Sequence, residues 1–209
     1  MRKIRDQKMN IRFHTPNGLQ CKFLGQELAE EMRATGFRTM RLSLESVSPE
    51  RQKDMSMKVD TDTFARAAEA VHKAGFAIND LDAYIMMALP GQPLYEVLQT
   101  MAFVHTNRIG IRLAAYSPIP GTQDYQRAID AGFSTIAEEP LLTNNSAIPV
   151  CAPGLTYETY NRVALLAKTL NRELHKSARP FCTEKDVLDR LCLQFTDDEL
   201  FSVVLSGQC

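Results

Sequence analysis

One pattern recurs along the chain: a helical segment ends at a glycine, an aromatic or β-branched residue follows, and an apolar run comes next. It occurs around Gly36, Gly75 and Gly110, so the glycines lie 39 and 35 residues apart (75 minus 36 and 110 minus 75). Glycine commonly follows the last turn of a helix, and one strand–helix–strand unit occupies roughly 30 residues or more. The spacing therefore predicts an array of alternating strands and helices.

Hydrophobic patterning divides this array into four strands and three intervening helices. The predicted strands are residues 11–14, 38–44, 82–89 and 111–116, and the predicted helices are residues 25–34, 62–73 and 94–106. In the second helix apolar residues recur at helical spacing on one face, and Asp60, Thr61 and Asp62 offer an N-terminal cap. Sequential strands joined by helices form a parallel sheet with right-handed crossovers. The predicted fold class is therefore α/β.

The composition limits the classes of partner. With 209 residues, of which 44% are hydrophobic and 23% charged, the chain can bury a sizeable core in one domain with or without an appendage. A formal net charge of -1 gives no basic excess for nucleic acid. No apolar run reaches the roughly 18 residues of a membrane span, and the first residues lack the apolar segment of a secretory signal. We expect a cytoplasmic protein that binds neither nucleic acid nor membrane.

The cysteines form no recognisable site. Cys21, Cys151, Cys182, Cys192 and Cys209 are odd in number and widely spaced, so they predict neither a disulfide framework nor a zinc site. Cys182 and Cys192 are 10 residues apart (192 minus 182), too far for the ligand pairs of a compact iron–sulfur motif. We therefore expect no metal site built from this chain.

All four predicted strands end in polar or turn-forming residues. The segments at these ends are His14-Thr15-Pro16-Asn17-Gly18, Ser43-Leu44-Glu45-Ser46, Leu89-Pro90-Gly91-Gln92 and Tyr116-Ser117-Pro118-Ile119-Pro120-Gly121. Each alone has the composition of an ordinary turn. In parallel sheets, however, the loops after the carboxyl ends of the strands lie together and carry ligand sites. Four such segments predict a shared ligand site.

The segments RFHTPNGL, RLSLESVSPER, AYIMMALPGQ and LAAYSPIPGTQDY, in this order, resemble the second part of the radical S-adenosylmethionine (SAM) core. The similarity is greatest to the group that often carries an N-terminal cobalamin-binding domain, and it extends to EEPLLTNNS near residue 145. The resemblance implies a partial TIM-type barrel of six strands, of which residues 1–145 supply the third to the sixth.

The resemblance also implies what this chain lacks. In the family, a loop after the first strand carries three cysteines in the pattern CxxxCxxC, which hold a 4Fe-4S cluster that chelates SAM. These 209 residues contain no such loop. The expected function is therefore the distal half of a radical SAM enzyme that needs an N-terminal part, fused or separate, to supply the cluster and any cobalamin domain. The alternative is a non-catalytic α/β binding module or an inactive, truncated product. The substrate, expected to be a small molecule, and the catalytic residues remain unassigned.

The end of the second strand is the first place where the resemblance implies SAM contacts. Ser43 and Glu45 would accept hydrogen bonds from ribose hydroxyls or from the methionine amino group, and alternation puts both on the same side of the strand. The alternatives for Glu45 are an N-terminal helix cap or an ion pair with Arg41 or Arg51.

Two further loops are implied at the site. Thr15 and Asn17 would contact the ligand through side chain or backbone, whereas the alternative for Asn17 is a left-handed turn. Tyr116 and Ser117 would lie beside the adenine or the substrate, where the proline-rich turn fixes the wall of the site. We expect His14 to be a structural histidine with its hydrogen bonds satisfied rather than a base.

The third strand end matches the adenine contact of the family through its backbone. The residues concerned are Ala88, Leu89, Pro90 and Gly91. Ala88 stands where a glycine is common in the family, which is a departure from the pattern.

The organisation changes after residue 145. Residues 146–155 contain two prolines and predict a linker, and residues 156–209 predict a helical C-terminal extension. Within the extension, residues 156–174 form an amphipathic pattern that we expect to pack against the open barrel, and shorter helices are predicted at 184–193 and 197–205.

Overall fold

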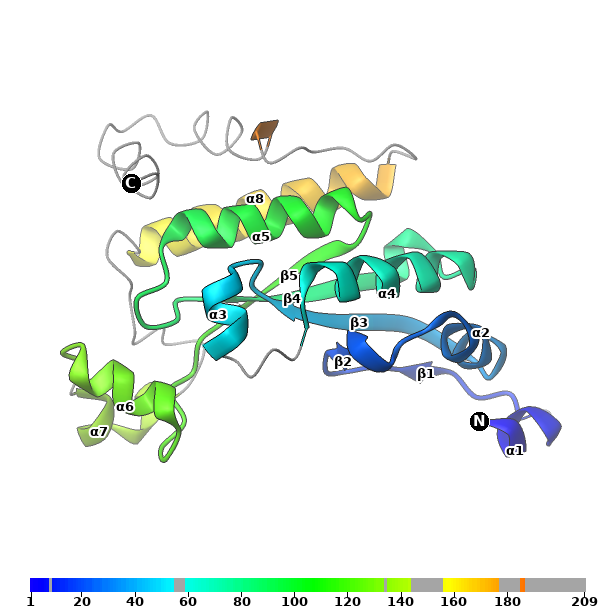
Figure 1. Ribbon diagram of the computed structural model, residues 1–209, viewed down its shortest axis with the longest axis horizontal. Helices are drawn as coiled ribbons and strands as arrows, with labels where there is room; N and C mark the ends of the chain where they lie inside the picture. Colours follow the sequence, from blue (N-terminus) through cyan, green and yellow to red (C-terminus); the bar gives the residue numbers. More distant parts are fainter. Residues whose placement is uncertain (8, 55–58, 134, 144–155, 177–184, 187–209) are drawn as a thin grey trace.

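The sheet of this protein is a parallel half-barrel. The computed structural model describes residues 1–7, 9–54, 59–133, 135–143, 156–176 and 185–186. Its strands are β1 (Phe13–His14), β2 (Leu19–Gln20), β3 (Phe37–Glu45), β4 (Leu81–Met87) and β5 (Gly110–Ala115). They lie in the order β1-β3-β4-β5, and β2 pairs with β3 further along that strand than β1 does. All of these pairs are parallel. Since β1 and β2 share one edge of β3, the sheet has the four strand positions that the sequence predicts, and the α/β partial TIM-type barrel is confirmed (Figure 1).

One helix precedes the first strand, and the other helices lie between the later strands or follow the last one. They are α1 (Arg2–Asp6), α2 (Gln26–Ala34), α3 (Pro49–Asp54), α4 (Thr61–Lys73), α5 (Leu94–Thr106), α6 (Gln123–Asp130), α7 (Thr135–Glu138) and α8 (Tyr157–Lys176). Short 3-10 turns occur at Cys21–Phe23, Ile78–Asp80 and Pro140–Thr143. The helices α4, α5 and α8 lie along one face of the sheet (Figure 1). Among the described residues, no helix is both long and apolar enough to cross a membrane.

Helix α4 illustrates why these segments fold as they do. The Asp60 carboxylate accepts a hydrogen bond from the Thr63 N–H at 2.6 Å, which confirms the predicted cap. Phe64 and Val71, one on each side of the helix midpoint, are fully buried against the sheet. Burial of such side chains contributes about 1.5–3 kcal/mol each. The helix ends before Gly75, whose φ of +83° is the left-handed conformation that glycine adopts readily.

Strand β3 separates an apolar face from a polar one. Met40, Leu42 and Leu44 are buried and belong to the main hydrophobic core. The alternate residues, including Ser43 and Glu45, are half-buried, so the two lie on the same side of the strand as predicted. The helices therefore cover one face, and polar side chains occupy the other.

Helix α8 closes the outer edge of β5. The side-chain amide of Asn171 accepts a hydrogen bond from the Ile111 N–H at 2.7 Å and donates one to the Ile111 carbonyl at 2.8 Å. A neighbouring strand would make the same two bonds, so Asn171 stands in for one at this position. A ring nitrogen of His105, on α5, lies 3.1 Å from the Leu170 carbonyl and links the two helices. The predicted packing of this helix against the open barrel is therefore confirmed.

Several details differ from the predictions. Strand β4 ends at Met87 rather than at residue 89, because Ala88 has a left-handed backbone with φ of +68°. The short elements β2, α3, α6 and α7 were not predicted. The predicted linker at 146–155 lies outside the described residues. So do the predicted helices at 184–193 and 197–205, apart from residues 185 and 186.

Candidate functional site

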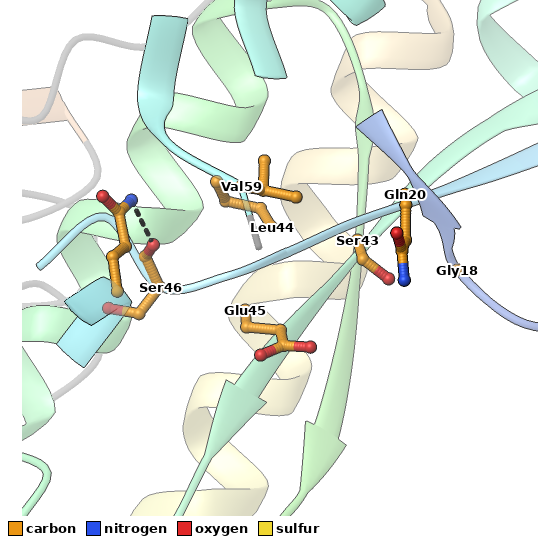
Figure 2. Close-up of a pocket in the computed structure, with 8 residues that line it drawn as sticks. Gly18, Gln20, Ser43, Leu44, Glu45, Ser46 and Val59 are labelled. Atoms are coloured by element: carbon orange, nitrogen blue, oxygen red, sulfur yellow. Dashed lines mark hydrogen bonds between the residues drawn. The ribbon is translucent and has the colours of Figure 1, made fainter. Parts of the chain in front are cut away.

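A cleft of about 140 Å³ opens at the carboxyl end of β3. Its lining residues come from the ends of β2 and β3 and from the segments around α3: Gly18, Gln20, Ser43, Leu44, Glu45, Ser46, Gln52 and Val59. Figure 2 shows Ser43 and Glu45 on one side of β3, with Leu44 and Val59 on the other. A Cβ at Gly18 would overlap the Ser43 hydroxyl and lie 3.3 Å from the Ser43 Cα, so a larger residue would displace the Ser43 side chain or the loop.

The backbone at Glu45 is strained. Its φ is +71°, and the Ser46 N–H donates to the Leu44 carbonyl across it at 2.9 Å. A hydrogen bond that spans one residue of positive φ is the pattern of the rare, strained form of γ-turn. The pairing of β3 with β4 shifts register between Ser43 and Glu45 at the same point. Backbone strain of this kind costs about 1–3 kcal/mol and concentrates at functional sites.

The Glu45 carboxylate has no hydrogen-bond or ion-pair partner in the part of the chain that the structure describes. The Arg41 guanidinium donates to the Pro16 carbonyl at 2.9 Å, and the Arg51 Nε donates to Glu96 at 2.7 Å. The Ser48 hydroxyl, rather than Glu45, accepts the Arg51 N–H at the start of α3. Both structural alternatives for Glu45, the ion pair and the helix cap, are therefore wrong. The half-buried Glu45 carboxylate therefore has no partner among the described residues.

The loop after β4 presents backbone rather than side chains. Ala88 and Leu89 are buried, and Pro90 is half-buried. Gly91 is exposed with φ of +67°, and a Cβ added there would have no atom within 4 Å. Ala88, which stands where the family commonly has glycine, thus has a backbone conformation that glycine favours. The accessible backbone of this loop is at Gly91, three residues further on.

At the end of β1 and in the loop after it, His14 and Thr15 make hydrogen bonds to residues of β3. The Thr15 hydroxyl is buried and accepts the Arg41 N–H at 2.8 Å. Asn17 is exposed and its φ is not positive, so its predicted alternative, a left-handed turn, is wrong. His14 Nδ1 lies 2.8 Å from the Thr39 hydroxyl, which agrees with a histidine whose hydrogen bonds are satisfied.

The turn after β5 anchors a second hydrophobic cluster. Tyr116 is buried there with Leu89, Ala128 and Ile136. Its hydroxyl is also buried and has no partner among the described residues. Burial, with a smaller effect from the Asp124 charge, raises the pKa of Tyr116 to about 12.

Ser117, the next residue in this turn, is also engaged by its own chain. Its hydroxyl donates to the Thr143 carbonyl. The turn therefore ties β5 to the short helix at Pro140–Thr143.

Of the ten residues predicted to bind a cofactor, only Ser43 and Glu45 line the cleft. The structure adds Gln20, Ser46 and Gln52. The signal for Gln52 was available, since it follows the serine–proline start of a short polar helix next to the strand end. Gln20 belongs to β2, whose two residues are too few to show a pattern.

The described residues do not fit an iron–sulfur cluster. No three His, Cys, Asp or Glu side chains gather within them at metal-binding distances. Cys21 is buried and free, and burial raises the pKa of its thiol to about 12. Since the thiolate is the form that binds metals, Cys21 is unsuited to this role.

The comparison with known families is informative for the first half of the chain. The model of the radical SAM superfamily matches residues 1–104. This range runs from α1 into α5 and includes the cleft and the loop after β4. No sequence among the curated proteins matches the chain.

Proposed function

Residues 1–104 belong to the radical SAM superfamily, and from this premise we propose that the chain supplies the distal strands of a SAM-binding barrel. Members of this superfamily use SAM and a 4Fe-4S cluster. The observation that carries the proposal is the Glu45 carboxylate, which lies half-buried at the carboxyl end of β3 and has no partner among the described residues. An uncompensated acceptor in such a place is costly unless a ligand or solvent supplies donors.

The chemistry of the cleft suits one part of SAM. Its ribose hydroxyls and its methionine amino group are donors, whereas the Glu45 carboxylate and the Ser43 hydroxyl can accept. A Cβ added at Gly91 would meet no atom within 4 Å, so we propose that the adenine approaches the backbone there. When bound to a reduced cluster, SAM supplies a 5′-deoxyadenosyl radical. In the proposal, the residues of this chain bind and orient the cofactor rather than carry out that step.

The size of the cleft supports a site that is completed by other residues. Cavities that bury a small molecule usually measure about 300–1,000 Å³, whereas this one measures about 140 Å³. We propose that an N-terminal part, fused or separate, provides the remaining wall and the CxxxCxxC loop that these 209 residues lack. Any cobalamin would bind in that part too, because the resemblance assigns cobalamin to a domain before the barrel.

The two edges of the sheet suggest where this N-terminal part docks. At the β5 edge, the Asn171 side chain already binds the backbone N–H and carbonyl of Ile111. At the other edge, the Phe13 N–H donates to the carbonyl of Gly36, which directly precedes β3. The Thr15 N–H donates to the Thr39 carbonyl within β3. Since successive residues of a strand point their backbone groups to opposite sides, the intervening groups face away from β3. We propose that the missing strands pair at the β1–β2 edge.

The proposal is tested by reading the adjacent coding sequence in all three frames for CxxxCxxC and co-expressing that part with this chain. Calorimetric titration of the anaerobically reconstituted complex should detect one SAM site, and the 209 residues alone should give no stoichiometric 4Fe-4S absorbance. A full cluster in the 209 residues alone, or a complex that carries a cluster yet binds no SAM, would overturn it. The alternative, a non-catalytic α/β module, predicts neither a neighbouring cysteine loop nor SAM binding.

A further inference from the structure

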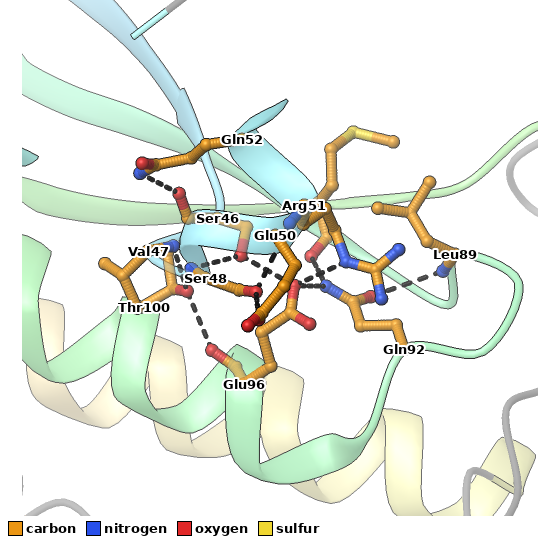
Figure 3. A network of polar contacts seen from close by, with 11 residues as sticks. Ser46, Val47, Ser48, Glu50, Arg51, Gln52, Leu89, Gln92, Glu96 and Thr100 are labelled. Atoms are coloured by element: carbon orange, nitrogen blue, oxygen red, sulfur yellow. Dashed lines mark hydrogen bonds and ion pairs between the residues drawn. The ribbon is translucent and has the colours of Figure 1, made fainter. Parts of the chain in front are cut away.

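One buried carboxylate oxygen receives hydrogen bonds from three segments of the chain. Glu96, on α5, is 6% exposed. Its Oε1 accepts from the Ser46 hydroxyl at 2.6 Å, from Arg51 Nε at 2.7 Å and from Gln92 Nε2 at 3.1 Å. Figure 3 shows these side chains meeting between the start of α5 and the loops after β3 and β4. Glu96 therefore joins two strand-end loops that are far apart in sequence.

On the β3 side, the partner of Glu96 directly follows the strained residue. Ser46 comes after Glu45 and donates its N–H across it to Leu44. The Ser46 hydroxyl also accepts the Ser48 N–H at 3.0 Å, and Gln52 donates to the Ser46 carbonyl at 2.9 Å. The network thus fixes the position of Ser46 and the backbone at Glu45, from which the Glu45 side chain projects.

On the β4 side, the partner of Glu96 supports a second left-handed residue, Ala88. The Gln92 side chain donates to the Met86 carbonyl at 3.1 Å and accepts the Leu89 N–H at 3.2 Å. These two backbone groups lie on either side of Ala88, whose φ is +68°. Gln92 therefore holds the chain on both sides of the turn, and Glu96 holds Gln92.

The charge of Glu96 is balanced within the network. Arg51 lies on α3 with its side chain 18% exposed and pairs with Glu96. Removing one partner of such a pair leaves the other charge poorly solvated, so the loss of either partner is costly. The Thr100 hydroxyl adds a second link, since it donates to the Glu96 carbonyl at 2.7 Å and accepts the Val47 N–H at 3.1 Å.

We propose that Glu96 is a positioning residue that couples the left-handed turn at Glu45 to the one at Ala88. The coupling keeps a carboxylate and an open backbone segment at fixed places on one rim, so that one ligand can meet both. The identity of this ligand as SAM rests on the proposed function. The coupling itself is a property of this chain and is testable without any ligand.

Hydrogen exchange on the full chain tests the coupling. Glu96→Gln keeps the shape of the side chain and removes its charge, and charge-assisted hydrogen bonds are about twice as strong as neutral ones. Amides of residues 44–48 and 88–92 should then exchange about tenfold faster or more, while those of α8 keep their rates. Glu69→Gln, at an exposed carboxylate on α4 paired with Lys73, is the matched control and should change neither loop. Unchanged loops, or equal acceleration throughout the sheet, would refute the coupling.

A stricter test changes a residue next to the turn at Glu45 and measures hydrogen exchange in the turn at Ala88. This test remains available if Glu96→Gln does not fold. Ser46→Ala removes one donor to Glu96 and the acceptor of the Ser48 N–H, and neither hydrogen bond involves residues 88–92. Coupled turns require faster exchange at residues 88–92 in this variant. Acceleration confined to residues 44–52 would mean that the two turns are independent and that the proposal is wrong.

A SAM titration separates this inference from the proposed function. In a complex that binds SAM, both Ser46→Ala and Glu96→Gln should weaken binding at least about tenfold with little change in melting temperature. Undiminished binding in both variants would refute the positioning role while leaving the SAM site intact. If the unsubstituted complex binds no SAM, the proposed function fails, and the exchange experiment alone decides the coupling.

Discussion

Glu45 and Ala88 lie at the carboxyl ends of neighbouring strands, and both have left-handed backbones, with φ of +71° and +68°. Such values are uncommon for residues other than glycine. Each residue is held by a dedicated bond, the Ser46 N–H across Glu45 and the Gln92 side chain around Ala88. Two of the three residues other than glycine that have a positive φ in the described chain therefore lie at the edge where parallel sheets bind ligands; the third, Arg108, lies before β5.

Replacement of Ala88 by glycine tests this strain. A left-handed conformation costs an L-residue about 1–2 kcal/mol, and glycine avoids that cost but loses about 0.5–1 kcal/mol of backbone entropy. We expect Ala88→Gly to leave the free energy of unfolding unchanged or to raise it by about 1 kcal/mol. Ala83→Gly is the control, since Ala83 is equally buried within β4 and its φ is not positive.

Ala83→Gly should lower the free energy of unfolding by about 1–2 kcal/mol, from backbone entropy and the lost methyl group. Urea denaturation of the two variants measures both values. A loss of similar size at Ala88 would show that its left-handed backbone is not a source of strain.

Two tyrosine hydroxyls offer a second matched comparison. The Tyr116 hydroxyl is buried without a partner among the described residues, whereas the Tyr84 hydroxyl donates to the Pro16 carbonyl at 3.0 Å. An unpaired buried hydroxyl costs about 1–3 kcal/mol, and a satisfied one contributes about 1 kcal/mol. Thermal melting should therefore show Tyr116→Phe as stable as the parent or more stable, and Tyr84→Phe as less stable. The reverse order would mean that Tyr116 has a partner outside the described residues.

Much of the framework was predictable from local patterns. The predicted helix at 94–106 coincides with α5, and the predicted cap at Asp60 is present. Alternation also placed Ser43 and Glu45 on one side of β3. These features depend on periodicity and on neighbours within a few residues, which a single sequence contains.

The rest depends on contacts between distant residues. Ser46 and Glu96 are 50 residues apart, and Ile111 and Asn171 are 60 apart. From the sequence, a glutamate or an asparagine on a helix is predicted to be an ordinary surface residue, because burial of these residue types is uncommon. Only the packing of α5 and α8 against the sheet identifies Glu96 and Asn171 as structural. The left-handed backbones of Glu45 and Ala88 were not predicted either, because neither residue type favours that conformation locally. Contacts with residues elsewhere in the chain stabilise both.

The role of Asn171 as a substitute strand leads to a prediction about assembly. Asn171→Leu keeps the volume near α8 but leaves the N–H and carbonyl of Ile111 without their partner. We expect a loss of about 1–3 kcal/mol in the free energy of unfolding, and self-association through the exposed edge. Analytical ultracentrifugation over a range of concentrations detects the association.

Asn161→Leu is the control for that experiment, because Asn161 is exposed on the same helix. It should change neither stability nor assembly by a comparable amount. If the two leucine variants behave alike, added surface hydrophobicity rather than the β5 edge would explain the association.

Cys21 gives the protein a calculable dependence on alkaline pH. The thiol donates to the Ser43 carbonyl at 3.4 Å, and burial raises its pKa from 9.0 to about 12. Because the folded state holds this proton more tightly, the contribution of the thiol to stability is complete below pH 9. It is lost as pH rises from 9 towards 12, by at most about 1.4 kcal/mol per pH unit.

The test compares the unsubstituted chain with Cys21→Ala in urea at pH 8 and at pH 10.5, because the comparison cancels the other titrating groups. The advantage of the cysteine should shrink at the higher pH. An advantage that is the same at both values would mean that the buried thiol does not keep its proton.

The Glu45 carboxylate supplies the prediction closest to function. Once an N-terminal part with the cysteine loop is co-expressed, Glu45→Gln should weaken SAM binding in calorimetric titration. A charge-assisted hydrogen bond in a partly desolvated site contributes about 1.5–3 kcal/mol, which is roughly ten- to over a hundredfold in affinity. The melting temperature should hardly change, because the carboxylate has no partner within the described residues and glutamine keeps the shape of the side chain.

Glu50→Gln is the matched control for this prediction, since Glu50 is an exposed carboxylate on the adjacent helix α3 and does not line the cleft. It should leave SAM affinity unchanged. Two results would count against a ligand role for Glu45. Equal losses at Glu45 and Glu50 would indicate a general effect of negative charge near the site, and early unfolding of Glu45→Gln with normal binding in the folded fraction would indicate a structural role. A loss of affinity at Glu45 alone, at constant stability, would mean that the cofactor supplies the hydrogen-bond donors that the described residues do not.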